Sequence, residues 1–286
     1  MMKKISTCML LATLSGFLLS CVATAGCVSK DPHHDTPWRL KPQESFGLML
    51  VKIEMTPKKC ENIKNPKKKC NLKKLDLKKK IATSVGSSIV VYKNISKSQT
   101  FILTAAHVCD TSATDEFIYS PGNNQYKITL EQKVLSIEIV DYTGTKREAA
   151  VHSLDKPNDL CIVYTKNLWG KPFRVSNTNP VIGQKVYNVA SPHKIWSPGM
   201  VLMLDGYYSG QAINGFYHYT VPARPGSSGS PIFDSRGRIV GMVQRAVTGF
   251  ENLALSTSTQ AIREIMSSIP KDKPSTYDIN QLNRMR

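Results

Sequence analysis

Apolar residues fall in many short runs along the chain rather than in long helical repeats. Such runs predict β-strands, and turn signals such as Pro121-Gly122 and Thr143-Gly144 separate them. The runs in the first half are 46–53, 81–92, 101–104, 127–130, 134–141 and 149–154. Those in the second half are 183–190, 199–204, 216–221, 231–233 and 239–245. Many short strands at this spacing predict an all-β barrel or sandwich.

One stretch near the C-terminus has helical periodicity instead. Ser258 is suited to cap a helix over 260–269, and Pro270 is suited to stop it. The apolar residues on one face of this predicted helix are Ala261, Ile262, Ile265, Met266 and Ile269. Residues 166–172 are interpreted as a crossing between two halves of the chain, and 270–286 as a C-terminal tail.

The N-terminus has the pattern of an export signal. Lys3 and Lys4 precede an apolar stretch over 9–19 that is short for a membrane anchor. Small residues at 23–25 predict a signal peptide over 1–25, followed by a polar N-terminal arm over 26–43. Alternatively, Cys21 becomes the lipidated first residue of a lipoprotein. Export to the periplasm or medium implies an oxidising compartment, and we expect no transmembrane segment in the mature chain.

The positive charge is concentrated in one segment. The chain has 286 residues and a net charge of +17, and residues 52–80 hold twelve lysines against Glu54, Glu61 and Asp76, or about +9. This lysine-rich segment, interpreted as a loop, could contact an anionic surface such as lipid or cell-wall polymer. The other interpretation, which we favour, is a solvated loop. Nucleic acid is not expected as a partner, because the segment has no aromatic residue for base stacking.

Three short blocks hold the candidate chemistry. The sequence PGSSGSP spans 225–231, TAAHV spans 104–108, and NDL spans 158–160. A tight glycine turn can expose a serine hydroxyl and aim backbone N–H groups into the same space. A histidine and a buried aspartate, in the order His, Asp, Ser, complete the set that converts a hydroxyl into a nucleophile. Rival hydroxyls are Ser227 and Ser230, and fallback carboxylates are Asp141 and Asp155.

These blocks, in this order and with their strand contexts, resemble the chymotrypsin-like (trypsin-like) serine peptidase family over about 86–269. Ser230 to Phe233, with Ile239 to Gly241 downstream, is most similar to the bacterial glutamyl-endopeptidase and HtrA-type branches. The resemblance implies two six-stranded antiparallel β-barrels, about 44–166 and 172–257, and a closing helix, within a protease domain over 44–269. It also implies an exported serine endopeptidase that acts through an acyl-enzyme, cleaves protein or peptide substrates and needs no cofactor.

The resemblance also assigns roles to residues. Ser228 is the expected nucleophile, His107 the general base, and Asp159 the carboxylate that orients His107. The backbone N–H groups of Gly226 and Ser228 are expected to form the oxyanion hole. Two positions depart from the family pattern: Ser227 replaces an aspartate or asparagine, and Ser230 replaces a glycine. Neither departure removes a catalytic group.

The expected substrate pocket is formed by Pro222, Ala223, Arg224 and Gln244. Pro222, six residues before the nucleophile, provides no charge for a lysine or arginine side chain. We therefore expect cleavage after small or medium apolar residues. An acidic preference, assisted by Arg224 or His218, is the alternative. A second hypothesis for the whole protein is a catalytically weak or inactive relative that binds an anionic polymer through the lysine-rich segment.

The cysteines predict disulfides and no metal site. Cys60 and Cys70 flank part of the lysine-rich segment and could close it as a loop. Cys109 and Cys161 each lie two residues after a predicted catalytic residue, so a bridge between them is plausible, but both could equally be small buried residues. Cys27 would be the odd thiol. No Cys/His spacing resembles a zinc site.

Overall fold

The fold is described from a computed structural model, which covers residues 41–65, 67, 70–75, 77–110, 114–122, 124–247 and 249–270. All of these residues belong to one unit, Asp35–Arg286. The predicted signal peptide, the alternative lipid site at Cys21, most of the N-terminal arm, Cys27 and nearly all of the C-terminal tail lie outside the described residues.

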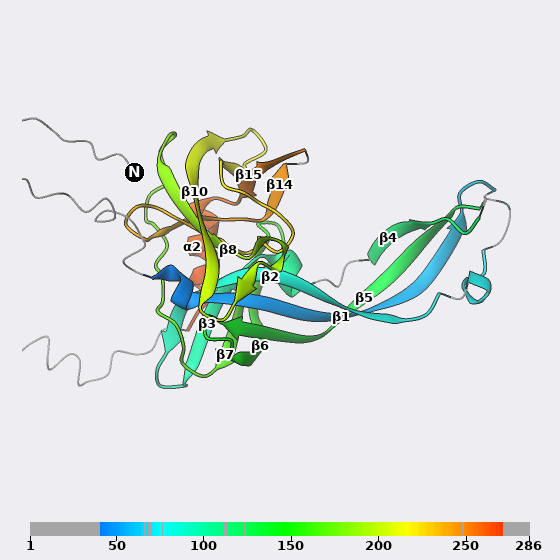
Figure 1. The fold of residues 1–286 in the computed structure, drawn as a ribbon, viewed down its shortest axis with the longest axis horizontal. Coiled ribbons are helices and arrows are strands. Elements are labelled where there is room, and N and C mark those ends of the chain that lie inside the picture. Colours follow the sequence, from blue (N-terminus) through cyan, green and yellow to red (C-terminus); the bar gives the residue numbers. More distant parts are fainter. Residues whose placement is uncertain are drawn as a thin grey trace, which may run out of the picture. The chain divides into compact units, whose positions relative to one another are not determined.

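Seven antiparallel strands form the first sheet (Figure 1). They are β1 (Phe46–Asn62), β2 (Lys80–Asn94), β3 (Gln99–Thr104), β4 (Thr114–Tyr119), β5 (Tyr126–Asp141), β6 (Lys146–Asp155) and β7 (Leu160–Lys166). Their order is β1-β2-β3-β7-β6-β5-β4, and an additional β1–β5 pairing closes the sheet. The result is a closed six-stranded barrel with β4 attached to β5. The barrel holds fully buried side chains such as Ile89, Leu103 and Ile162, whose removal from water stabilises it.

A second sheet follows in the chain. Its strands are β8 (Lys185–Ala190), β9 (Trp196–Ser197), β10 (Met200–Gln211), β11 (Tyr217–Tyr219), β12 (Pro231–Phe233), β13 (Ile239–Met242), β14 (Arg245–Val247) and β15 (Phe250–Ser256). The order is β13-β12-β8-β10-β11-β15-β14, and β9 pairs with β10. Among the described residues no pairing closes this sheet, so it forms a half-barrel. The two sheets confirm the all-β, chymotrypsin-like fold class.

Helices are few and short in the described part of the chain. They are α1 (Ala106–Cys109), α2 (Thr259–Met266) and the 3₁₀ turns η2 (Pro42–Ser45), η3 (Leu72–Leu75) and η4 (Pro192–Lys194). Helix α2 is the expected C-terminal helix, and the Ser258 side chain caps it by accepting a hydrogen bond from the Ala261 N–H at 3.1 Å. It ends at Met266, three residues earlier than predicted, although Ile269 is still buried.

The largest difference from the sequence prediction is in the lysine-rich segment. The prediction ended a strand at Ile53 and placed a basic loop after it, but β1 continues to Asn62. Beyond Met55, β1 pairs with β5 alone, and β5 is one strand where two were predicted. The distal parts of β1 and β5, together with β4, which was not predicted, form a β-sheet extension that projects from the barrel (Figure 1). The sequence of this extension does not alternate between apolar and polar residues. Cross-strand pairing and ion pairs such as Lys58–Glu131 at 2.6 Å stabilise it instead.

Both cysteine pairs are joined in the structure. Cys60, near the end of β1, is bonded to Cys70, with the two Cα atoms 5.6 Å apart. Cys109, at the end of α1, is bonded to Cys161 in β7, with 6.5 Å between the Cα atoms. The second bond crosslinks the segment that contains His107 to the strand that follows Asp159.

A buried ion pair in the β5–β6 turn makes stability depend on pH. Asp141 is buried and accepts hydrogen bonds from Arg147 Nη2 at 2.7 Å and Thr143 Oγ1 at 2.6 Å. Burial alone would raise the pKa of Asp141. Hydrogen bonds from Thr143, Arg147 and the Thr145 backbone, with the charge of Arg147, outweigh burial and hold its pKa below the ordinary 3.8.

We predict that Asp141→Asn lowers the unfolding free energy at pH 7 by roughly 1–3 kcal/mol, the usual cost of disrupting a buried charged hydrogen bond. Because the pKa is lower in the folded state, this stabilisation is complete above the unfolded pKa and is lost as pH falls through the folded pKa. The difference between variant and wild type should therefore shrink below about pH 4. Urea unfolding at pH 7 and pH 3 measures this difference in unfolding free energy. The control is Asp205→Asn, because Asp205 forms an exposed pair with Lys185. A difference that is unchanged at pH 3 would contradict the prediction.

Candidate active site

Adjacent strands bring the predicted base and carboxylate together. His107 lies in α1, directly after β3, and Asp159 lies directly before β7. Strands β3 and β7 pair in antiparallel register, with Thr104 opposite Cys161. The end of one strand therefore lies beside the start of the other.

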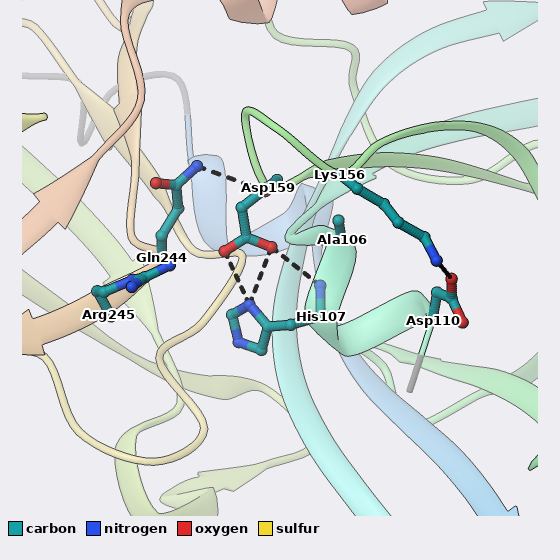
Figure 2. A pocket seen from close by; sticks show the side chains of 7 residues that line it. All are labelled: Ala106, His107, Asp110, Lys156, Asp159, Gln244 and Arg245. Carbon is teal, nitrogen blue, oxygen red and sulfur yellow. Dashed lines mark hydrogen bonds and ion pairs between the residues drawn. The ribbon is translucent and has the colours of Figure 1, made fainter. Parts of the chain in front are cut away.

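His107 and Asp159 form a two-point contact (Figure 2). His107 Nδ1 is 2.8 Å from Asp159 Oδ2 and 3.0 Å from Oδ1. The His107 backbone N–H also donates to Asp159 Oδ1 at 2.9 Å. The Asp159 side chain is 14% exposed and that of His107 is 48% exposed. The carboxylate is thus held against one ring nitrogen, while much of the imidazole remains accessible.

The turn before Asp159 has an unusual backbone conformation. Asp159 has φ +52°, in the left-handed region that few residues other than glycine occupy. The fallback carboxylate Asp155 stabilises this turn, because it accepts hydrogen bonds from the Asn158 backbone N–H at 3.1 Å and from Asn158 Nδ2 at 2.8 Å. The other fallback, Asp141, is bound to Arg147. Neither fallback contacts His107 within the described residues.

Ser228 lies in the turn before β12 and is half-buried. Its Oγ donates to the Gln244 carbonyl oxygen at 3.2 Å, and no hydrogen bond joins it to His107 among the described residues. Its own carbonyl accepts from the Ser87 N–H at 2.8 Å. Ser87 belongs to β2, so the first barrel contacts the turn directly. Sequence reasoning missed Ser87, because its role depends on contact across the two sheets.

Two glycines permit the conformation of this turn. Gly226 has φ +98° and Gly229 has φ +84°, conformations that side chains disfavour. A Cβ on Gly229 would also collide with the Ser87 carbonyl oxygen and Thr104 Oγ1. The Gly226 carbonyl oxygen accepts a hydrogen bond from Ser87 Oγ at 2.8 Å, which fixes the orientation of this peptide group. Within the described residues, the N–H groups of Gly226 and Ser228 donate no hydrogen bond, as the predicted oxyanion hole requires.

The rival hydroxyls are engaged inside the protein. Ser227 and Ser230 are both fully buried. Ser227 Oγ accepts from the Arg224 N–H at 3.3 Å, and Ser230 Oγ accepts from Asn188 Nδ2 at 2.9 Å. Of the three serines in the turn, Ser228 alone is not fully buried. At the position where the family usually has an acidic or amide residue, Ser227 therefore stabilises the turn internally.

A cavity of about 400 Å³ lies beside Ser228. Its lining residues are His107, Ala223, Arg224, Pro225, Ser228, Val243, Gln244, Arg245 and Ala246. Of the predicted pocket residues, Ala223, Arg224 and Gln244 are present, whereas Pro222 does not line it. Sequence reasoning missed Val243, Arg245 and Ala246, the neighbours of the predicted Gln244. No carboxylate lines this cavity among the described residues.

A second cavity, of about 590 Å³, borders His107 and Asp159 (Figure 2). An ion pair between Lys156 Nζ and Asp110 Oδ2, 2.6 Å apart, lies at its edge. Arg245 lines both cavities and lies 5.3 Å from the centre of the Phe216 ring. The described residues contain no cluster of histidine, cysteine and acidic side chains suited to a metal ion. Within that part of the chain, no helix has the length and apolarity needed to cross a membrane.

Comparisons with known proteins identify the family. Residues 86–242, more than half of the chain, match the family described as a trypsin-like peptidase domain. The chain belongs to the trypsin-like peptidase family. The matched region of this trypsin-like peptidase includes His107, Asp159 and Ser228. Gln244 lies just beyond it.

A solved structure supports the fold of this trypsin-like peptidase. The serine endoprotease from Yersinia pestis superposes with a TM-score of 0.53 at 14% sequence identity. The match covers 82% of this chain and 65% of that protein. At this identity the likeness shows the fold alone. No curated protein matches the chain by sequence, so the glutamyl-endopeptidase subtype remains a prediction.

Proposed function

We propose that the protein is an exported serine endopeptidase that hydrolyses peptide bonds through Ser228, His107 and Asp159. The observation that carries the proposal is the arrangement around His107. One ring nitrogen is held 2.8 Å from the Asp159 carboxylate, while the same histidine lines the cavity that contains Ser228. A serine hydroxyl is a weak nucleophile near neutral pH, so it needs a base beside it.

The proposed reaction begins with attack by Ser228 Oγ on the substrate carbonyl carbon. As the bond forms, His107 Nε2 takes the hydroxyl proton, and Asp159 stabilises the resulting imidazolium through Nδ1. For this step the Ser228 side chain rotates, so that its hydroxyl no longer donates to the Gln244 carbonyl. The carbonyl oxygen gains negative charge, and we propose that the N–H groups of Gly226 and Ser228, which donate no other hydrogen bond in the described residues, bind it. One such donor contributes about 3–4 kcal/mol in the transition state.

The second half of the reaction releases both products. His107 gives its proton to the leaving amine, the C–N bond breaks, and an acyl-enzyme on Ser228 Oγ remains. A water molecule then attacks the ester carbonyl while His107 accepts its proton. Collapse of this second intermediate releases the carboxylic acid, and His107 returns the proton to Ser228. The proposed reaction uses no redox partner or cofactor.

Two disulfides support the export part of the proposal, since such bonds persist in oxidising compartments. The signal peptide and the lipid site are separate predictions on residues outside the described part.

Contact between the lysine-rich segment and an anionic surface is a weaker proposal. Lys52, Lys58 and Lys79 of this segment already pair with Glu138, Glu131 and Glu54. Glu138 and Glu131 lie outside the segment, so these two pairs lower the positive charge that the segment offers to a partner. The catalytically inactive alternative is disfavoured because His107 and Asp159 are in direct contact and Ser228 remains accessible.

A fluorophosphonate probe tests the proposed function. Such probes phosphonylate an activated serine and leave ordinary hydroxyls unmodified. We expect one adduct per mature chain, located by mass spectrometry on the peptide that contains Ser228, and hydrolysis of unfolded casein. A folded protein that neither reacts nor hydrolyses would refute the peptidase proposal.

The cavity beside Ser228 predicts the residue preferred before the cleaved bond. Ala223 and Val243 are buried, and with Ala246 they give this cavity small apolar walls. Lysine or arginine would lose water there without gaining a carboxylate partner. We predict that kcat/KM for alanine or valine at this position exceeds that for lysine by at least about 10²-fold.

A peptide library cleaved by the purified protein measures this preference. Dominant cleavage after lysine or arginine would contradict it. Dominant cleavage after glutamate would support the alternative, in which case Arg224→Gln and His218→Gln identify the responsible group. His218 is half-buried on β11 and does not line this cavity, so Arg224 is the stronger candidate.

A further inference from the structure

Gln244 connects the two halves of the candidate site. It follows β13, immediately after Val243, and its side chain is only 2% exposed. Its backbone carbonyl accepts the Ser228 hydroxyl at 3.2 Å. Its side-chain amide points toward Asp159 (Figure 2). Gln244 lines the cavity beside Ser228, as the sequence predicted, and its amide group in addition contacts the turn that contains Asp159.

The amide group of Gln244 bonds to backbone rather than to another side chain. Nε2 donates to the Asn158 carbonyl oxygen and, at 3.4 Å, to the Asp159 carbonyl oxygen. Both partners can only accept hydrogen bonds, so the NH₂ group must face them. Oε1, which is buried, has no hydrogen-bond partner. Burying an unpartnered amide oxygen is costly, and the two donated bonds are what hold the group there.

The turn that Gln244 contacts needs support. Asp159 occupies the left-handed region at φ +52°, and such a conformation persists where its surroundings over-determine it. Asp155 stabilises the turn from within the first barrel. Gln244 contacts it from the second sheet. A shift of this backbone would move the Asp159 carboxylate, which lies 2.8 Å from His107 Nδ1.

Gln244 is also fixed relative to the nucleophile. The Val243 carbonyl accepts from the Gly229 N–H at 2.7 Å, and the Val243 N–H donates to Ser230 at 2.9 Å. These bonds attach the residue before Gln244 to the residues that follow Ser228. The backbone position of Gln244 is therefore set by the turn of Ser228, and its side chain sets the turn of Asp159.

We infer that Gln244 is a positioning residue that holds Asp159 in register with His107 and Ser228 across the two sheets. The inference rests on the proposed peptidase function and deepens it. Misplacing a catalytic group by about 1 Å costs about 10²-fold in rate. Losing the amide donor should therefore lower turnover with little effect on substrate binding, because the amide NH₂ contacts the Asp159 turn and the backbone of Gln244 is unchanged in every variant.

The test variant is Gln244→Met, which keeps the length of the side chain but cannot donate. We expect kcat to fall about 10²-fold with KM within about threefold of wild type. In the Asp159→Asn background, Gln244→Met should lower kcat by less than about threefold, because Gln244 acts through Asp159. A full 10²-fold loss in that background would overturn the inference.

A spectroscopic readout separates this inference from the peptidase proposal. In wild type, the His107 Nδ1 proton should give a downfield NMR signal protected by Asp159, and Gln244→Met should lose it to exchange with water. An unchanged signal would overturn the inference even in an active enzyme. Loss of the signal in a protein that never hydrolyses peptides would support it while the peptidase proposal fails.

A matched control addresses general loss of stability. Asn188 is fully buried, and its Nδ2 also donates two bonds, to Ser230 Oγ and the Pro231 carbonyl oxygen, away from the Asp159 turn. Asn188→Leu should destabilise the fold comparably and leave the His107 signal in place. Gln244→Asn, which keeps the amide but is too short to reach the turn, replaces Gln244→Met if that variant does not fold.

Discussion

Replacing Ser228 with alanine is expected to abolish peptide hydrolysis, with a fall in kcat of about 10⁶-fold. The substitution removes one hydroxyl that is half-buried and donates a single hydrogen bond at 3.2 Å. The turn itself is held by other groups, among them the Ser87 N–H and the Gly229 N–H. The fold should therefore survive, and fluorophosphonate labelling should disappear.

Steady-state hydrolysis and mass spectrometry of the labelled protein measure both effects. Ser227→Ala serves as the control in the same turn, since Ser227 is buried and bonded to Arg224. It should lower stability without removing the labelled site. Persistent labelling in Ser228→Ala would move the nucleophile to another residue and refute the assignment.

Replacing Asp159 with asparagine should lower kcat by about 10⁴-fold. Asparagine preserves the shape of the side chain and tolerates the left-handed backbone at φ +52°. Its amide cannot stabilise the imidazolium, and its NH₂ group favours the wrong tautomer of His107. The cause of the loss is therefore electrostatic and tautomeric rather than structural.

The corresponding measurement is kcat/KM on one peptide, with circular dichroism to verify the fold. Asp110→Asn is the matched control. Asp110 is also an aspartate and lines the same cavity of about 590 Å³ as His107 and Asp159, but it pairs with Lys156. It should retain most activity. Near-normal turnover in Asp159→Asn would exclude Asp159 from the catalytic set, and the bonds of Asp155 to Asn158 make Asp155 a poor substitute.

The chemistry of the candidate site could be predicted locally. Activating a serine requires a base, a carboxylate and two free N–H groups, and few residue types can provide them. His107, Asp159 and Ser228 could therefore be proposed from short blocks, and in the structure His107 contacts Asp159. The strands β2, β3 and β12 could be located for a similar reason, since their buried apolar runs are local signals.

Other features depend on partners far away in the sequence. β1 continues to Asn62 because β5, more than sixty residues later, pairs with it. Its lysine-rich sequence has no apolar alternation, so nothing local marked it as a strand. β15 was missed although it lies in the sheet between β11 and β14. Strand pairing over such separations is decided by tertiary contacts rather than by local propensity.

The amino-acid order alone was enough to identify the family and to propose the reactive residues, because residue type and local spacing limit the chemistry, but it left the Cys109–Cys161 bridge open. The folded chain decided which groups hold those residues in place. Ser87 and Gln244 are ordinary residues in the sequence, and they matter only because two sheets bring them to the turns of Ser228 and Asp159. Hydrogen bonds act over about 3 Å, so no pattern along a single strand could reveal these contacts.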